Sequence, residues 1–526
     1  MTADELSRAD QERFSALKRR LAQIWDGLNR DDSFAHTSVI VPSQSVNQEE
    51  LAKIEGAPFY EERLLFALIR LRNPNARLCY VTSQPVHPDV IDYYLQLLVG
   101  VPASYAKQRL RLLCVYDANP APLTEKILQR PRVIDRLRDW IGDTERAYLT
   151  CYNSTVLERR LSLELDIPLN GIDPELLELG TKSGSRRVFI EAGVPTPAGF
   201  EDLNTEEQLV RALVALASAR PGIRRAVVKL NQGFSGEGNA IFNFPLQLAE
   251  GKAARTELIR QRLNQLQWSS ATENYVRFMR KFREMGGVVE EMIEAEEIHS
   301  PSAQMRVCPD GTPWLISTHE QVLGGSTGQV YLGCRFPARS AYHRLIREQA
   351  RKIGEVLSRK GVIGRFGIDF LLSRDSNEAW NAYALEINLR MGGTTPPFHA
   401  LEFLTSGRLD RDTGAFLAPD GRQKYYYATD NLKSSSYRGL LPEDLLELVA
   451  RYGLHFNHSK GAGVLFYMFG ALSQFGKLGM TAIGNNRQEA DDIFNKTVAI
   501  LDGETHANSD TRGRLTPLFD HPVRME

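Results

Sequence analysis

Two neighbouring apolar strands of this chain carry polar residues that could bind a metal ion. Asp369 lies in the first strand, and Glu386 and Asn388 lie two positions apart in the next. Because side chains alternate along a strand, Glu386 and Asn388 point to one sheet face, and an antiparallel neighbour can place Asp369 beside them. Carboxylate and amide oxygens are hard ligands that suit Mg²⁺. Considered alone, the three residues predict either a Mg²⁺ site or a buried salt bridge with Arg365 or Arg390.

A glycine-rich loop follows an earlier predicted strand. The strand Ala226–Leu230 contains Lys229 and leads into the segment NQGFSGEG, which has three glycines and a serine. Glycines let backbone N–H groups approach phosphate oxygens, and the lysine adds a positive charge. The spacing differs from that of a P-loop, and considered alone the segment is better interpreted as an ordinary hairpin.

A third candidate is an acidic segment, Glu290–Glu297, which continues from the apolar strand Val288–Ile293. Backbone groups after a strand can hydrogen-bond to an adenine edge, and a carboxylate can accept from the adenine amino group or from ribose hydroxyls. Considered alone, a solvated acidic turn is the better interpretation.

The order of these three elements along the chain resembles that of the ATP-grasp superfamily. The resemblance covers about residues 180–400, and its most specific part is Glu386-Ile-Asn-Leu-Arg390 after Asp369. It implies an ATP-binding set consisting of Lys182, Lys229, Ser235, Gly236, Gly238, Glu290, Glu291, Met292, Ile293 and Glu297. It also implies that Asp369, Glu386 and Asn388 hold two Mg²⁺ ions.

Within that set, the resemblance gives each residue a role. The two lysines bind phosphates, and Ser235, Gly236 and Gly238 belong to a flexible loop over them. Glu290 faces the adenine amino group, and Glu297 holds the ribose. The backbone of Glu291, Met292 and Ile293 lies along the base.

One position departs from the ATP-grasp pattern. Many ATP-grasp ligases have an arginine close before the metal-binding Asp, which helps to hold an acyl phosphate. Here Phe366 and Gly367 occupy the near positions, and Arg365 is further back. We rank Arg390 first as the replacement, with Arg365 and Arg306 as the other candidates.

Longer stretches of the chain resemble the pheganomycin-type peptide ligases. They are Tyr80–Pro85, Gly180–Arg186, Lys229–Ala240 and Asn388–Pro396. This resemblance implies ATP-dependent joining of an amino-acid or peptide carboxylate to an amine through an acyl phosphate, with release of ADP and phosphate. The alternatives are a ligase for a small non-peptide carboxylate and a non-catalytic ATP-binding regulatory module.

The elements that must position these residues form an α/β and α+β multidomain protein. Strands near residues 38–42, 77–82, 109–115 and 147–150 alternate with helices, which predicts a parallel, Rossmann-like sheet without a dinucleotide motif. The helical periodicity of residues 4–30 predicts an amphipathic N-terminal helix. The expected units are an extension (1–36), a pre-ATP-grasp domain (37–178), an ATP-grasp fold of two α+β subdomains (179–405) and a small α+β C-terminal domain (406–526).

The segments after the metal motif are less informative. The loop Gly392–Pro397 is either a cradle for a substrate carboxylate or a turn that leaves the sheet. Helices are expected near 440–452 and 486–501 and a strand near 463–469, whereas residues 503–526 are expected to be poorly ordered. His319 and Glu320 are candidates for a general base, although a structural histidine is the better interpretation.

Composition limits the class of protein. The formal net charge is −1, which argues against a nucleic-acid partner. Five cysteines occur singly, as is typical of a reducing compartment. The start of the chain lacks the apolar core of a secretory signal, and Gly463–Leu472 is too short to span a bilayer. We therefore expect a cytoplasmic protein with no membrane partner; a homodimer is expected only by analogy with other ATP-grasp proteins.

Overall fold

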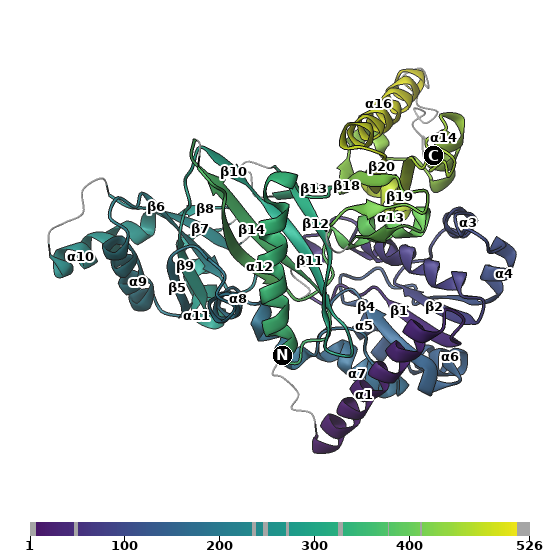
Figure 1. Ribbon diagram of the computed structural model, residues 1–526, viewed down its shortest axis with the longest axis horizontal. Coiled ribbons are helices and arrows are strands. Elements are labelled where there is room, and N and C mark those ends of the chain that lie inside the picture. Colours follow the sequence, from purple (N-terminus) through teal and green to yellow (C-terminus); the bar gives the residue numbers. More distant parts are fainter. Residues whose placement is uncertain are drawn as a thin grey trace, which may run out of the picture.

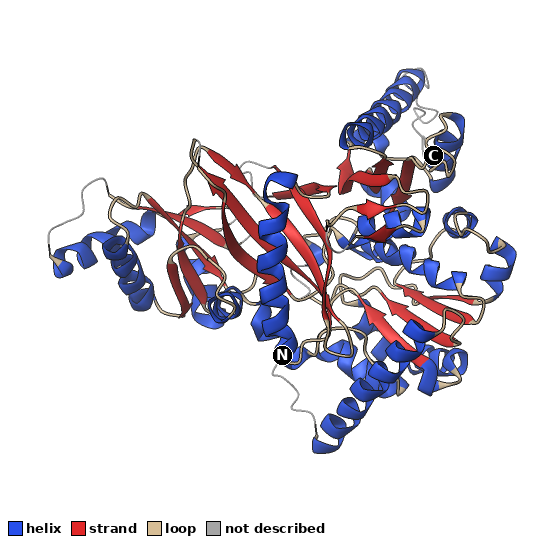
Figure 2. Cartoon of the chain, viewed as in Figure 1, coloured by secondary structure: helices blue, strands red, loops and turns tan. Residues whose placement is uncertain are grey.

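The computed structural model describes residues 7–46, 51–233, 238–245, 251–269, 273–324, 330–376, 378–410 and 413–512. Within them the strands form a four-stranded, a five-stranded and an eleven-stranded sheet, each flanked by helices (Figures 1 and 2). No helix in these ranges is both long enough and apolar enough to cross a membrane.

The first sheet is parallel, as the strand–helix alternation predicts. Its strands are β1 (His36–Val41), β2 (Ala76–Thr82), β3 (Leu110–Cys114) and β4 (Ala147–Cys151), in the order β3-β2-β1-β4. The helical segments around them are η1 (Ala57–Arg72), α3 (Pro88–Gln96), α4 (Ala103–Gln108), α5 (Leu123–Leu128), α6 (Pro131–Ile141), η2 (Thr144–Arg146), α7 (Val156–Leu165) and η3 (Pro174–Gly180). The helical segment between β1 and β2 is a 3₁₀ helix, η1.

The predicted N-terminal helix is α1 (Arg8–Arg30), which lies along this first unit (Figure 1). The Ser7 hydroxyl caps it by accepting from the Asp10 N–H at 3.1 Å. Phe14, Leu17, Leu21 and Ile24 are buried, as their helical spacing predicts.

The five-stranded sheet has most of its helices on one face. Its strands are β5 (Gly199–Leu203), β6 (Arg225–Leu230), β7 (Asn239–Asn243), β8 (Gln267–Trp268) and β9 (Gly287–Glu291), in the order β5-β9-β6-β7-β8. The helices on that face are α9 (Glu206–Ala219), α10 (Lys252–Arg262), η4 (Leu263–Gln265) and α11 (Tyr275–Met285), whereas α8 (Lys182–Glu191) lies on the opposite face, where Arg186 meets Glu290. Val228 and Val289 enter the helix-covered core, so Lys229 and Glu290 point to the other face.

The largest sheet contains the predicted metal motif. Its first strands are β10 (Glu297–His299), β11 (Pro301–Val307), β12 (Pro313–Gly324), β13 (Val330–Phe336), β14 (Gly364–Arg374) and β15 (Asn381–Asn388). β14 pairs antiparallel with β11 on one side and with β15 on the other. Helix α12 (Ser340–Arg359) crosses one face of this sheet (Figure 1) and packs on Phe366 and Ile368.

The last part of the chain continues this sheet. Its elements are α13 (Thr395–Thr405), β16 (Arg408–Leu409), β17 (Phe416–Leu417), β18 (Gln423–Lys433), η5 (Ser435–Tyr437), α14 (Pro442–Arg451), β19 (Gly463–Tyr467), η6 (Phe469–Ala471), α15 (Leu472–Phe475), β20 (Lys477–Gly484) and α16 (Arg487–Arg512). β13 pairs with β18, and one core joins this part to the first unit, where the Tyr94 hydroxyl donates to the Phe466 carbonyl at 3.1 Å.

One expectation for this part of the chain is corrected. Helix α16 runs to Arg512, so residues 503–512 are helical instead of poorly ordered. After β15 the chain turns at residues 393–394, and Pro396 and Pro397 lie in the first turn of α13, where proline is compatible with a helix. The domain boundaries stay predictions.

Helix α11 offers a matched test of how the five-stranded sheet is stabilised. We expect Phe278→Ala to lower the free energy of unfolding by about 3–5 kcal/mol, because the ring is fully buried and its loss leaves a cavity. Val276→Ala on the same helix should change it by less than about 0.5 kcal/mol, because Val276 is 76% exposed. Denaturant unfolding measures both values, and equal losses would contradict this packing.

Candidate active site

A cleft of about 740 Å³ lies between the five-stranded sheet and the large sheet, and the first unit and the C-terminal strands complete its wall. It brings together most of the residues expected to act on ATP. Those that line it are Lys182, Lys229, Glu290, Glu291, Met292, Ile293, Asp369, Glu386, Asn388 and Arg390. They come from both sheets, so the cleft is formed where the two sheets face each other.

The carboxylates of the metal motif lie side by side. Asp369 on β14 is directly opposite Glu386 on β15, and Asn388 is opposite Gly367. Asp369 accepts hydrogen bonds from the Gln321 and Asn388 side-chain amides at 2.7 and 3.0 Å. Burial, and then the nearby charge of Glu386, raise the pKa of Asp369 to about 6. Two close carboxylates are a donor set that a divalent cation would suit.

Lys182 brings a positive charge to this pair. It is the first residue of α8, whose N-terminus is capped by the Thr181 hydroxyl accepting from the Gly184 N–H at 2.9 Å. The Lys182 ammonium forms an ion pair with Glu386. A Cβ at Gly184 would lie 2.0 Å from the Glu178 carbonyl oxygen, so glycine is needed there to place this helix end.

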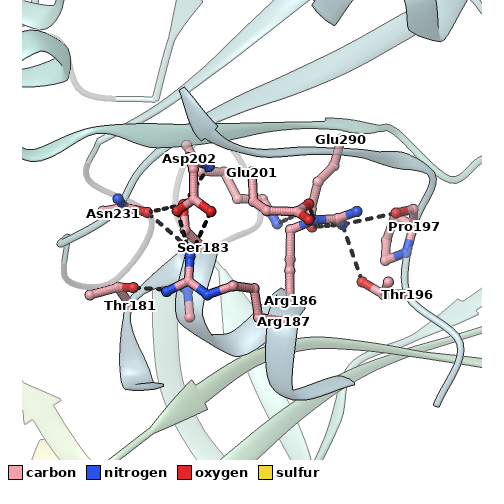
Figure 3. A network of polar contacts seen from close by, with 12 residues as sticks. Thr181, Ser183, Arg186, Arg187, Thr196, Pro197, Glu201, Asp202, Asn231 and Glu290 are labelled. Atoms are coloured by element: carbon pink, nitrogen blue, oxygen red, sulfur yellow. Dashed lines mark hydrogen bonds and ion pairs between the residues drawn. The ribbon is translucent and has the colours of Figure 1, made fainter. Parts of the chain in front are cut away.

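Lys229 lies in the five-stranded sheet, opposite the metal motif. A buried carboxylate on the neighbouring strand of the same sheet holds it. Glu290 is 1% exposed, and its two oxygens accept from Lys229 at 2.5 Å and from Arg186 at 2.6 Å. Figure 3 shows the Arg186 guanidinium between Glu290 and Glu201. Burial alone would raise the pKa of Glu290, but the two cations hold it below its ordinary value. Its side chain therefore positions Lys229, and the expected contact with an adenine amino group stays a prediction.

The backbone beyond Glu290 leaves the sheet along the cleft. The Glu291 N–H donates to the Ala198 carbonyl at 2.7 Å, and the Met292 N–H donates to the Arg225 carbonyl at 3.0 Å. Ile293 follows them and also lines the cleft. This segment is the predicted hinge along the base, and its place in the cleft fits that role.

Glu297 does not line the cleft, and its expected role at the ribose stays a prediction. Along β10 and the residue after it, Ile298 and Ser300 line the cleft, and the alternation of the strand turns Glu297 and His299 away. The Glu297 carboxylate accepts from Arg374 at 2.7 Å and lies 2.8 Å from His299.

The glycine loop is described only in part. Ser235 and Gly236 lie outside the described residues. Gly238 begins the return strand, has φ +89°, and accepts from the Leu230 N–H at 2.9 Å. The left-handed backbone explains the glycine, and its place at the base of the hairpin is that of a hinge residue more than of a phosphate ligand.

The three candidate arginines separate into two places. Arg390 lines the cleft and donates to the Asn388 side-chain oxygen at 3.1 Å. Arg306 and Arg365 are cross-strand neighbours that line a second hollow beside the cleft. Arg390 therefore stays the candidate nearest the metal motif, and the other two are not beside it.

His319 is a structural residue, as the better interpretation expected. It is fully buried, and its Nε2 lies 2.5 Å from the Tyr426 hydroxyl. Burial lowers the pKa of His319 to about 3. Glu320 accepts from the Tyr342 hydroxyl at 2.5 Å and from the Arg339 N–H at 3.0 Å. Neither side chain lines the cleft, so neither is placed to act as a base there.

The sequence did not indicate a second polar end of the cleft. Arg63 lies 4.4 Å from the ring centres of both Tyr60 and Tyr152, and it donates to Asp430 at 3.1 Å. Lys477 lines the same end. These residues come from distant segments, and the only local indication was a charged run at 61–63 in an apolar segment.

Comparison with known proteins agrees with this geometry. The sequence model of a family described as "IQCH-like, ATP-grasp" matches residues 174–276 and 262–412. The two matches together span residues 174–412, which include the five-stranded sheet and the metal motif. A second model, described as "PGM1 C-terminal domain", matches residues 444–497, which lie in the last part of the chain.

Two similar proteins extend the comparison along the chain. The L-propargylglycine–L-glutamate ligase of Streptantibioticus cattleyicolor is 29% identical over 89% of this chain and 94% of its own length. The IQ motif-containing protein H of Danio rerio is 22% identical over 94% of this chain, which spans 51% of that protein.

Two solved structures share this fold at low sequence identity. The biotin carboxylase domain of the Hydrogenobacter thermophilus 2-oxoglutarate carboxylase superposes with a TM-score of 0.52 at 13% identity, covering 88% of each chain. Biotin carboxylase from Campylobacter jejuni gives 0.51 at 13% identity, over 87% of this chain and 90% of its own.

The Glu290 ion pairs predict a pH-dependent stability. We expect Glu290→Gln to lower the free energy of unfolding at pH 7 by roughly 3–5 kcal/mol, because it removes the carboxylate that pairs with Lys229 and one of the two that pair with Arg186. The folded-state pKa of Glu290 lies below its ordinary value, so its charged form stabilises the fold above that value of 4.5. The stabilisation is lost as the pH falls through the folded-state pKa.

Denaturant unfolding at several pH values checks this expectation. The difference between wild type and Glu290→Gln should shrink as the pH falls below 4.5. Glu294→Gln is the control, because its ion pair with Arg225 is partly exposed. A difference that does not change with pH would show that shape, and not charge, decides the effect.

Proposed function

We propose that this chain is an ATP-dependent carboxylate–amine ligase that joins amino-acid or peptide substrates and releases ADP and phosphate. The observation that carries the proposal is the pairing of Asp369 with Glu386 in a cleft that Lys182 and Lys229 enter from the facing elements. The similarity to a ligase named for two amino acids supports an amino-acid or peptide substrate.

ATP is proposed to lie between the two sheets. The backbone of residues 291–293 lies along the base, and Lys182 and Lys229 offset phosphate charge. Asp369, Glu386 and Asn388 would hold two Mg²⁺ ions, which supply charge neutralisation for a phosphoryl group moving between oxygens. The Asn388 amide donates to Asp369 in this structure, so it would present its oxygen when it holds an ion.

The substrate carboxylate is proposed to lie at the end of β15. Arg390 follows the metal motif, and Gly392, Gly393 and Thr394 line the cleft just before α13. The Thr394 hydroxyl is buried and has no hydrogen-bond partner within the described residues. A helix N-terminus with an arginine beside it is suited to a carboxylate and to the acyl phosphate formed from it.

The reaction then proceeds by transfer of the terminal phosphoryl group of ATP to a carboxylate oxygen. The amine attacks the carbonyl carbon, the carbon–oxygen bond to phosphate breaks, and the proton of the amine leaves to solvent. Fixed charges from Lys182, Lys229 and Arg390 stabilise the negative charge that develops on the phosphoryl oxygens. No residue of this chain forms a covalent bond to the substrate.

The alternatives predict different behaviour. A ligase for a small non-peptide carboxylate would keep the same nucleotide end and differ at the Arg63–Asp430 end. A regulatory module without turnover predicts the loss of metal-binding carboxylates, but both Asp369 and Glu386 are present. A homodimer and a cytoplasmic location stay expectations.

Glu386→Gln tests the proposed chemistry. We expect about a 10²–10³-fold lower rate of ADP release with Mg²⁺ and a pool of amino acids and short peptides, because one charge of the metal site is lost. Glu348→Gln, on the exposed face of α12, should leave the rate unchanged. Mass spectrometry should find a product that is lighter than its two substrates by one water.

Two outcomes would overturn the proposal. Release of AMP and pyrophosphate would contradict an acyl phosphate. Equal ADP release by wild type and Glu386→Gln would show that the paired carboxylates do not act on the phosphoryl group.

A further inference from the structure

A second hollow, of about 240 Å³, lies beside the cleft and contains three arginines. Arg70 comes from η1, Arg306 from β11 and Arg365 from β14, so the first unit and the large sheet both contribute. Arg306 and Arg365 are directly opposite each other on neighbouring strands, which is an unfavourable arrangement for like charges unless something compensates them.

Within the described residues, no carboxylate forms an ion pair with any of the three guanidinium groups, although the nearby charge of Glu402 partly offsets that of Arg365. Arg365 makes no hydrogen bond or ion pair there. Arg306 stacks on the Trp25 ring at 4.2 Å and donates to Asn170 at 3.3 Å, while its Nε is buried without a partner. Arg70 donates only to the hydroxyls of Ser38 and Thr150, at 3.0 and 3.2 Å. The hydrogen-bonding capacity of this cluster is therefore largely unused.

The one acidic side chain that lines the hollow already has a partner. Glu402 lies 2.5 Å from the His399 ring nitrogen, but burial lowers the pKa of His399 to about 4, so at neutral pH Glu402 is a single negative charge against three guanidinium groups. Burial, and then the charge of Arg306, lower the pKa of Arg365 to about 9. A lowered pKa is the expected result of packing positive charges together, and a bound anion would reverse it.

A narrower space adjoins both the hollow and the active-site cleft and shares lining residues with each. This space, of about 60 Å³, shares Tyr152, Asn153 and Arg390 with the cleft, and it shares Arg306 and Arg365 with the arginine hollow. The three spaces follow one sheet face: on β14, position 365 and Asp369 are four residues apart, so their Cα atoms are separated by roughly 13 Å.

We propose that this arginine hollow binds the second carboxylate of an amino-acid or short-peptide substrate whose first carboxylate is activated at Arg390. The inference rests on the proposed ligase function and deepens it, because it defines the substrate class as a diacid. Arginine forks recognise carboxylates in two-point geometry, and three of them would select a charged group over an amide.

The remaining wall of the hollow suits the carbon chain of such a substrate. It is apolar, and its side chains include Leu21, Ile24 and Trp25 of α1 together with Leu64 and Phe66 of η1. An apolar wall with a few convergent charged groups is the usual composition of a small-molecule site. The N-terminal helix would then close a substrate pocket in addition to covering the first sheet.

Binding of L-glutamate without ATP tests this proposal separately from ligation. Trp25 stacks on Arg306, so its fluorescence should change when a carboxylate enters the hollow. We expect saturable titration of the full chain by L-glutamate and no response to L-glutamine, which has the same shape without the second charge. Trp25→Phe should remove the signal, which assigns it to this hollow.

Arg365→Met should weaken L-glutamate binding by about 10–100-fold, the effect of losing a hydrogen bond between charged groups. Arg365→Lys should restore part of it. ATP affinity of both variants should match wild type, which shows that they are folded. If Arg365 had only a structural role, wild type would not discriminate between L-glutamate and L-glutamine.

The outcomes separate this inference from the proposed function. Selective L-glutamate binding without any ligation product would retain the pocket and overturn the ligase. Ligation of neutral substrates with no L-glutamate response would retain the ligase and overturn the pocket. Saturation by inorganic phosphate but not by L-glutamate would also overturn it, because the hollow would then be a phosphate site.

Discussion

The antiparallel pairing of β14 with β11 and β15 is the constraint on which the active site depends. It sets Asp369 opposite Glu386, and the two-residue period of the strands places Arg365, Gly367 and Asp369 on one face while Phe366 enters the core beneath α12. A shift of one residue in this register would bury the carboxylates and expose the core. The metal motif and the arginine hollow therefore lie on the same face of the large sheet, and Arg390 lies beside the metal motif.

The facing sheet supplies the opposite charge, and its geometry depends on a buried carboxylate. Glu290 holds Lys229 toward the cleft and is itself fixed by Arg186, which also donates to the Pro197 carbonyl at 2.9 Å (Figure 3). Such a chain of contacts fixes a long, flexible lysine before a nucleotide arrives, so less conformational entropy is lost on binding.

Sequence reasoning found what depends on local period and missed what depends on distant contacts. The alternation of β15 was enough to place Glu386 and Asn388 together, and the strand–helix alternation was enough for the parallel sheet. It could not show that Arg186 would form an ion pair with Glu290, 104 residues away. It also could not show that η1 and α1 would cover Arg306 and Arg365, nor that Glu297 would turn from the cleft, because one residue of register decides that direction.

The fate of oxygen in the substrate carboxylate tests the central claim most directly. The carboxylate oxygens of the substrate pool are labelled with oxygen-18. If the substrate carboxylate becomes an acyl phosphate beside Asp369 and Glu386, one labelled oxygen passes to each phosphate released with ADP. We predict this label in phosphate from wild type, in proportion to the ligated product seen by mass spectrometry. Ligated product accompanied by unlabelled phosphate, or by label in AMP, would contradict the account.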